Sequence, residues 1–161
     1  FPTRRSSDLI VMSLTVFEGL QSEIYVPITP KSIFTPVTKP LSEMVIALAS
    51  ACGAHLKTDK RFNLAGDTTY REIPDNTPTD DLMISHGGYD NSDANRDINC
   101  MFPLDRLHEL AKAGFIKGTA PTHFGFMGGG GDQTAFHDKT GPAIAQKLKD
   151  ENVDGVILTA G

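Results

Sequence analysis

The chain has 161 residues, of which 39% are hydrophobic and 22% charged, a composition that suits one globular domain rather than two. Its formal net charge of −5 disfavours a surface for nucleic acid or anionic membranes, because such surfaces need clustered Lys and Arg. No run approaches the roughly 20 apolar residues that span a bilayer, and no secretory signal is recognisable, so we expect a cytoplasmic protein.

The N-terminal region divides into two predicted parts. Residues 1–11 are interpreted as a non-native leader, because FPTRRSSDL resembles the translation of a sequencing-library adapter. A disordered basic tail is the alternative. Residues 12–43 contain four prolines, which remove amide donors and fix φ, so we predict an extended arm or edge strand there. Such an arm would lie along a partner subunit.

The first core strand is predicted at residues 44–50, whose apolar run is nearly continuous. Residues 51–55 would form the loop after it. The polar, turn-rich residues 57–81 are predicted to be a long surface excursion, and residues 83–85 a brief second strand.

Helix and strand signals alternate in the second half of the chain. A helix is predicted from Pro103 to a stop at Gly114, with Phe115 and Ile116 packing beyond it. Residues 122–127 read as a strand, and a second helix would follow with Thr140 as its N-cap.

The last predicted element is an apolar strand at residues 153–161. Together, the elements of residues 44–161 predict an α/β domain with a mostly parallel sheet and helices on both faces. This would be a three-layer arrangement, incomplete at its C-terminus.

An imidazole and a carboxylate flank two glycines in the sequence HGGYD at residues 86–90. Histidine exchanges protons near neutral pH and a carboxylate can orient it, so His86 and Asp90 are the candidate acid/base residues. The alternative is that Asp90 and the polar residues after it cap turns.

Four glycines and an aspartate follow a predicted strand. Such a run allows positive φ and close approach of a ligand, but neither the dinucleotide fingerprint nor the phosphate-loop pattern fits it. Loops after strands of α/β sheets commonly bind ligands. We therefore predict a substrate loop at Gly128, Gly129, Gly130, Gly131 and Asp132, with a tight turn as the alternative.

The cysteines and histidines do not have the spacing of a metal centre. Cys52 and His55 form only half of a site, and Cys100 lies far from both in the sequence. Cys52 is predicted to be buried and inert. No metal or other cofactor is expected in this chain.

Five segments carry a resemblance to a known family. They are RFNLAGD at 61–67, SHGGYD at 85–90, CMFPLD at 100–105, FMGGGGD at 126–132 and DGVILTAG at 154–161. In this combination they resemble the selenoprotein B subunits of the Stickland reductases, which act on glycine, sarcosine, betaine or D-proline. The D-proline reductases are the nearest in pattern.

The resemblance implies an oxidoreductase of amino-acid fermentation that opens the ring of D-proline to 5-aminovalerate with a dithiol donor. In that family a selenocysteine follows the Thr-Ala-Gly strand end, which implies that the nucleophile follows Gly161 and that this fragment lacks it and is inactive. The implied partners are a subunit carrying a pyruvoyl group and a dithiol or redox-protein electron donor.

Two other interpretations stay open. One is component B of a glycine, sarcosine or betaine reductase. The other is a non-catalytic α/β binding module that uses the glycine loop for a small anion. Because the fragment would lack the helices that complete the domain, we also expect Val156, Ile157 and Leu158 to lack part of their apolar cover and to form an apolar patch or open edge.

Overall fold

The computed structural model describes residues 35–128 and 132–160, and the account below concerns these. The predicted leader, residues 1–11, lies outside the described residues. Residues 12–34 of the predicted arm also lie outside the described residues. Residues 35–43 are described, and they are irregular up to a short 3-10 helix, η1 (Leu41–Glu43).

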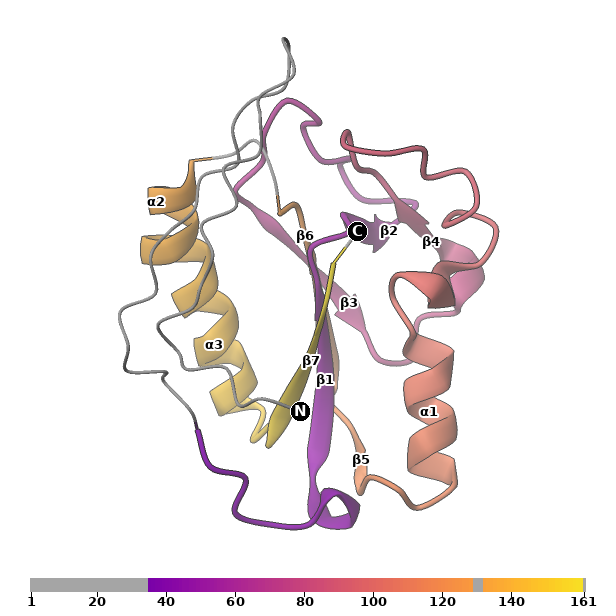
Figure 1. The fold of residues 1–161 in the computed structure, drawn as a ribbon, viewed down its shortest axis with the longest axis vertical. Coiled ribbons are helices and arrows are strands. Elements are labelled where there is room, and N and C mark those ends of the chain that lie inside the picture. Colours follow the sequence, from indigo (N-terminus) through magenta and orange to yellow (C-terminus); the bar gives the residue numbers. More distant parts are fainter. Residues whose placement is uncertain (1–34, 129–131, 161) are drawn as a thin grey trace, which may run out of the picture. The chain divides into compact units, whose positions relative to one another are not determined.

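A mixed, mostly parallel sheet forms the centre of the domain (Figure 1). Its strands are β1 (Val45–Ser50), β3 (Tyr70–Pro74), β5 (Gly118–Thr119), β6 (Thr122–Phe126) and β7 (Gly155–Thr159). β1 pairs in parallel with β5, β6 and β7, whereas β3 pairs antiparallel with β6. The apolar run of β1 suits this central place, because the strand is covered on both faces.

Helices cover the two faces of this sheet, with α1 on one side and α3 on the other (Figure 1). The helical elements are η2 (Thr79–Asp81), η3 (Ile98–Cys100), α1 (Leu104–Lys112), α2 (Gln133–Ala135), the π-helix η4 (Phe136–Thr140) and α3 (Gly141–Asp150). Leu48 and Leu107 belong to the core on the α1 side, and Ala49 and Ile144 to the core on the α3 side. The prediction of an α/β fold with a mostly parallel sheet and helices on both faces is confirmed.

The predicted surface excursion at residues 57–81 is wrong in part, because it contains β3. Ile73 of this strand is fully buried, while its neighbours Glu72 and Pro74 are exposed. The strand was missed because an edge strand with one buried residue has little apolar signal.

Two short strands form a separate antiparallel sheet, β2 (Ala54–Leu56) with β4 (Leu82–Ile84). The predicted loop at residues 51–55 therefore ends earlier, because Ala54 and His55 belong to β2. The strand predicted at residues 83–85 exists, shifted by one residue. It pairs with β2 and takes no place in the main sheet.

The second helical segment begins earlier than predicted. Thr140 has helical dihedrals (φ −68°, ψ −50°) and makes no capping bond, so it is not an N-cap. Its hydroxyl instead donates to the Thr68 carbonyl. The cap is Asp132, whose Oδ1 accepts from the Thr134 and Ala135 amides at 2.9 and 3.1 Å.

Two predictions about the burial of apolar side chains have different outcomes. Ile116 is buried as predicted, but Phe115 is 65% exposed, so its predicted packing is wrong. Val156, Ile157 and Leu158 of β7 are 38%, 41% and 74% exposed, which confirms the expected lack of cover. No helix in the described part of the chain is long and apolar enough to cross a bilayer.

Candidate active site

The carboxyl ends of β1, β6 and β7 meet at one edge of the sheet, called here the rim. The Ala51 N–H donates to the Thr159 carbonyl at 2.9 Å, and the Gly53 N–H donates to the Phe126 carbonyl at 2.9 Å. In open α/β sheets ligands bind outside the carboxyl ends of the strands. The rim is therefore where a site is expected.

Residues 100–105 are attached to the rim through one carbonyl group. The Met101 carbonyl accepts from Thr159 Oγ1 at 2.8 Å and from Ser50 Oγ at 3.4 Å. Phe102 is fully buried beneath it. The end of β7 is thus held by a side-chain bond as well as by the main chain.

The segment of residues 85–90 is docked on the rim by Gly53. This glycine has φ +75°, and a Cβ there would lie 2.2 Å from the Ser85 carbonyl oxygen, so only glycine fits. The Ser85 N–H donates to the Gly53 carbonyl at 3.0 Å, and Ser85 Oγ lies 2.9 Å from His55 Nε2. The next residue along the chain is His86.

His86 is half-buried and has a defined orientation. Its ring stacks on Tyr89 with centroids 4.8 Å apart and planes at 25°. The Gly88 N–H donates to His86 Nδ1 at 3.0 Å, so the neutral ring carries its proton on Nε2. Tyr89 stays neutral beside it, because burial raises its pKa to about 12.

Asp90 is not joined to His86. Its Oδ1 accepts from the Ser92 hydroxyl at 2.6 Å and from the Ser92 amide at 2.9 Å. These two bonds lower the pKa of this exposed carboxyl. Asp90 therefore takes the turn-capping arrangement, which was the alternative to orienting the imidazole.

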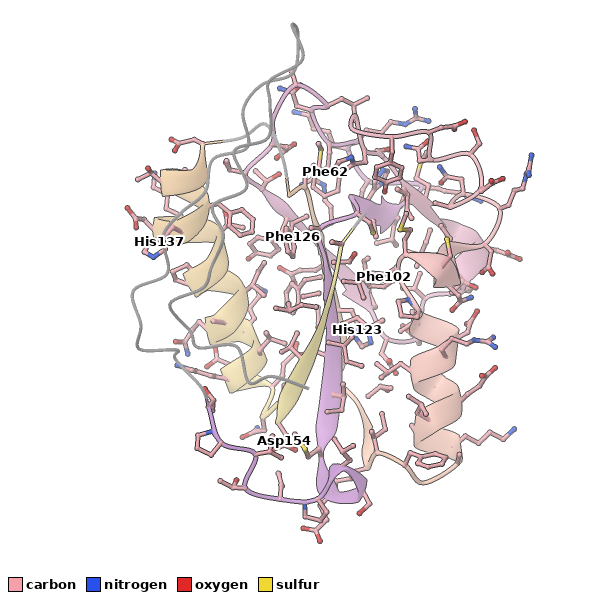
Figure 2. The ribbon with its side chains drawn as sticks, in the orientation of Figure 1. Phe62, Phe102, His123, Phe126, His137 and Asp154 are labelled. Atoms are coloured by element: carbon pink, nitrogen blue, oxygen red, sulfur yellow. The ribbon has the colours of Figure 1, made fainter. Side chains whose placement is uncertain are left out.

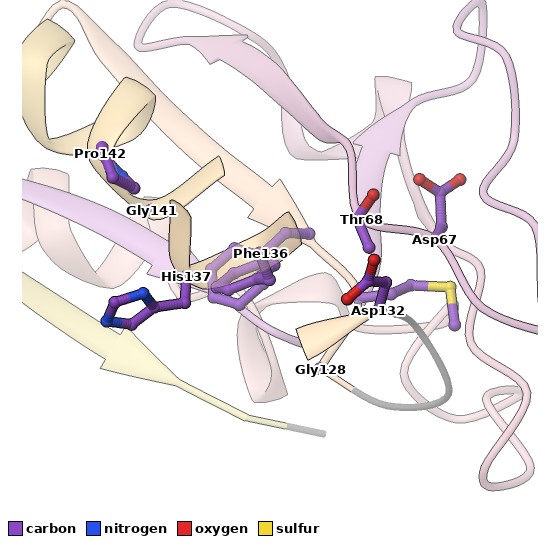
Figure 3. Close-up of a pocket in the computed structure, with 10 residues that line it drawn as sticks. Asp67, Thr68, Gly128, Asp132, Phe136, His137, Gly141 and Pro142 are labelled. Atoms are coloured by element: carbon purple, nitrogen blue, oxygen red, sulfur yellow. The ribbon is translucent and has the colours of Figure 1, made fainter. Parts of the chain in front are cut away.

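A cavity of about 580 Å³ lies at the end of β6 (Figure 3). Gly128 and Asp132 line it, as do Phe136 and His137 of the π-helix η4, whereas Gly129, Gly130 and Gly131 of the predicted substrate loop lie outside the described residues. A π-helix inside a longer helical segment frequently marks a functional site.

The other wall of this cavity brings a second carboxylate, Asp67, together with Thr68. Burial opposes ionisation of Asp67, but hydrogen bonds from Thr69 and Asn63 outweigh it and lower its pKa. The cavity is therefore acidic, with Asp67 and Asp132 on its walls.

His86 lines a different and smaller cavity of about 330 Å³, together with Arg61. The predicted site residues thus lie in two places along the rim. Arg61 was not singled out from the sequence. Its only signal was membership of the RFNLAGD motif.

The two cysteines differ in environment. Cys52 is fully buried, as predicted, and burial raises the pKa of its thiol, which disfavours the reactive thiolate. Cys100 is exposed. Among residues 35–128 and 132–160, no group of three His, Cys, Asp or Glu side chains is placed to hold a metal ion.

A cluster of polar and titratable side chains lies between the sheet and α1 and was not predicted from the sequence. It consists of Asp75, His108, Thr119 and His123 and is called here the Asp75 cluster. Asp75 Oδ1 accepts from His108 Nε2 at 2.8 Å and from His123 Nε2 at 2.9 Å, and Asp75 Oδ2 accepts from Thr119 Oγ1 at 2.9 Å. His123 Nδ1 accepts the Leu48 N–H of β1 at 3.0 Å. Figure 2 shows His123 in this central position.

The bonds of the Asp75 cluster set its protonation. Burial lowers the pKa of His123, which is 0% exposed, so the ring is neutral with its proton on Nε2. Burial opposes ionisation of Asp75, but hydrogen bonds from His123, His108 and Thr119 outweigh it and lower its pKa. Both ring nitrogens of His123 and both carboxylate oxygens of Asp75 have hydrogen-bond partners within the protein, as is usual for a structural polar cluster.

The fold and rim define an α/β domain with ligand-sized cavities at the carboxyl ends of its strands. Residues 2–161 match the family described as glycine/sarcosine/betaine reductase selenoprotein B. The chain therefore belongs to the selenoprotein B family of these reductases.

Individual relatives differ in their degree of similarity. The chain is 63% identical over 148 residues to the D-proline reductase subunit gamma of Acetoanaerobium sticklandii, covering 92% of this chain and 61% of that protein. It is 30% identical over 169 residues to a glycine reductase complex component B subunit gamma of Carboxydothermus hydrogenoformans, covering 98% of this chain and 37% of that protein.

The sarcosine reductase complex component B subunit beta of Peptoclostridium acidaminophilum is 27% identical over 164 residues, covering 98% of this chain and 37% of that protein. The chain thus spans between about a third and three-fifths of the length of these relatives. The comparison with solved structures found no match.

Proposed function

We propose that this chain is part of the selenoprotein subunit of a D-proline reductase, which opens the ring of D-proline to 5-aminovalerate with a dithiol as electron donor. The observation that carries the proposal is the 63% identity to a D-proline reductase subunit, against 27–30% for glycine and sarcosine reductase components. The reaction would take place in the cytoplasm, where thiols stay reduced.

The rim is the proposed location of the chemistry. The 161 residues contain no selenocysteine, and we place it in the segment that follows Gly161. Thr159 anchors the end of β7 to Met101 and to Ala51, which supports the placement, because a nucleophile has to be held in a fixed geometry.

The groups outside this chain would supply the electrons and the electron sink. A selenol acts as its anion and would provide the nucleophile, while a pyruvoyl group on the partner subunit would withdraw electrons from the substrate. Residues 1–161 by themselves are expected to be inactive. His86 and the loop from Gly128 to Asp132 are the proposed neighbours of the reacting atoms.

The experiment is to express the complete gene together with its partner subunit and to supply D-proline and a dithiol. Formation of 5-aminovalerate, with selenium-75 incorporated into this subunit, is the expected result. Glycine, sarcosine and betaine are tested in parallel, because turnover of one of them in place of D-proline would make the chain a component B of that reductase.

Two results would contradict the proposal. If no substrate is reduced and no selenium is incorporated, the chain is a binding module rather than a reductase subunit. If the codon after Gly161 encodes neither selenocysteine nor cysteine, the proposed nucleophile does not exist at that position.

A further inference from the structure

The cavity of about 330 Å³ next to the rim differs in charge from the larger one. Arg61 and His86 line it, and its other walls include Phe62, Leu64 and Met83. None of the residues that line it is an aspartate or glutamate. Its size lies at the lower end of the range of about 300–1,000 Å³ for small-molecule sites.

The two arginines of this region have different roles. The Arg71 guanidinium donates to the Lys60 carbonyl at 2.9 and 3.0 Å and to Thr69 Oγ1 at 2.7 Å, and it lies 4.3 Å from the centre of the Phe62 ring. It therefore contacts the backbone of the residue before Arg61 and the side chain of the residue after it.

The Arg61 guanidinium itself has no hydrogen bond or ion pair to any other side chain or carbonyl in the described part of the protein. A guanidinium is charged at every accessible pH and presents a planar fork of donors that matches a carboxylate. Arg61 is exposed, and a guanidinium that has no protein counter-ion at a cavity is available to an anionic ligand.

The opposite wall offers a second donor. Because His86 Nδ1 accepts the Gly88 N–H, the neutral ring has an N–H at Nε2 that is not used for the fold. Stacking on Tyr89 fixes the plane of the ring, and the Tyr89 hydroxyl donates to the Cys52 carbonyl at 3.4 Å.

The two walls are packed closely at Gly87. A Cβ at this position would lie 2.9 Å from the Leu64 carbonyl oxygen and 3.3 Å from the Leu64 Cβ. A larger residue would separate the loop of Arg61 from the loop of His86. The backbone thus keeps both donors at one cavity.

We propose that this cavity, the Arg61 cavity, binds the carboxylate of a small amino or imino acid, with Arg61 neutralising the charge and His86 Nε2–H donating to an oxygen. The apolar side chains of Phe62, Leu64 and Met83 would face the carbon skeleton of the ligand. The naming of D-proline as this ligand rests on the proposed function. The carboxylate chemistry rests on the cavity alone.

The test uses the complete protein with its partner subunit and the probe tetrahydrofuran-2-carboxylate. This compound keeps the ring and carboxylate of proline but has no nitrogen, so it reports carboxylate recognition alone. Calorimetry is expected to give a Kd at least tenfold weaker for Arg61→Met than for the unmodified protein. Arg61→Lys is expected to restore part of this loss, because it keeps the charge but not the fork.

Arg96→Met is the matched control, since Arg96 is an exposed arginine paired with Asp93 at 2.7 Å. Its Kd for the probe is expected to be unchanged. The uncharged analogue tetrahydrofurfuryl alcohol is expected to bind equally weakly to all variants. If Arg61→Met fails to fold, the Nε2 resonance of His86 in the unmodified protein still reports the probe, because binding is expected to shift it.

An unchanged Kd in Arg61→Met, or no binding and no shift of the His86 resonance, overturns the carboxylate site. Production of 5-aminovalerate is measured separately. If probe binding depends on Arg61 but D-proline is not reduced, the carboxylate site is supported and the proposed function is rejected. If D-proline is reduced but probe binding does not depend on Arg61, the proposed function is supported and the carboxylate site is rejected.

Discussion

The Asp75 cluster and the loop of His86 both combine histidine with aspartate, but they are built in opposite ways. In the cluster, one carboxylate accepts from two imidazoles and a hydroxyl, and the buried ring of His123 also completes the bonding of β1. In the loop, Asp90 turns away to Ser92, and His86 keeps an unused N–H at the edge of a cavity.

The difference separates a region whose polar groups bond one another from the region that we propose to bind a ligand. Buried polar groups with all their bonds satisfied rigidify a fold, and a cost follows when one partner is removed. A half-exposed donor with no protein partner contributes little to folding and is available to a ligand. The four predictions below test this contrast in the protein expressed from its complete gene.

The largest effect is expected for Asp75→Ala. The change leaves His123, His108 and Thr119 without their acceptor, and each buried unsatisfied group costs about 1–3 kcal/mol. Because Asp75 is partly exposed, we expect a loss of about 3 kcal/mol in the free energy of unfolding, measured by urea denaturation. A loss below about 1 kcal/mol would mean that the cluster does not stabilise the fold.

A smaller effect, on turnover rather than stability, is expected for His86→Ala. The variant removes the free Nε2–H, so kcat/KM for D-proline should fall by about tenfold to a hundredfold, equivalent to roughly 1.4–2.7 kcal/mol. The melting temperature should change little, because the ring is half-buried and only its Nδ1 bonds the backbone. Lower thermal stability with unchanged kinetics would make His86 structural.

The third prediction concerns pH. Burial lowers the pKa of His123 below its ordinary 6.5, so the unfolded chain binds the extra proton first as pH falls. The contribution of this group to the free energy of unfolding should therefore be complete above pH 6.5. Below pH 6.5 it should decline by at most about 1.4 kcal/mol per pH unit. A further loss should follow below about pH 3.8, because the pKa of Asp75 is also lowered.

His123→Asn should reduce the slope between pH 6.5 and 5 in denaturation curves measured across this range. The substitution should not abolish the slope, because burial also lowers the pKa of His55. The same slope in the variant as in the unmodified protein would show that His123 is not the group that titrates.

The smallest effect is expected for Asp90→Asn. An amide oxygen can still accept from the Ser92 amide and hydroxyl, and the site is exposed, so the free energy of unfolding should change by no more than about 0.5 kcal/mol. Turnover should also be nearly unchanged. A large fall in kcat alone would mean that Asp90 acts on the imidazole during the reaction.

Elements with a strong local pattern were predictable from the sequence. The apolar run of β1 and the Pro-to-Gly frame of α1 placed both elements correctly, and the strand ending before the glycine run is β6. β3 and the early start of the second helical segment were missed. β3 has a single buried residue, and the cap Asp132 directly follows the glycine run, which hid the start of the helical segment.

The candidate site was less predictable than the fold. His86 lies beside the rim, and its acid/base role stays a prediction, whereas Asp90 was chosen because it is near His86 in the sequence. Arg61, which shares a cavity with His86, lies 25 positions before it and has no local signal of binding. Short-range spacing indicates a turn as readily as it indicates a catalytic pair.

By itself, the sequence determined the class of fold and the family, because hydrophobic periodicity and extended motifs are properties of neighbouring residues. Only the tertiary structure decided which polar groups are partners. Asp75 contacts His108 and His123, which are 33 and 48 residues away in the chain, because β3 pairs with β6 in the sheet and α1 packs against that sheet. Such long-range hydrogen bonds depend on the completed fold, since donor and acceptor must lie within about 3 Å whatever their separation along the chain.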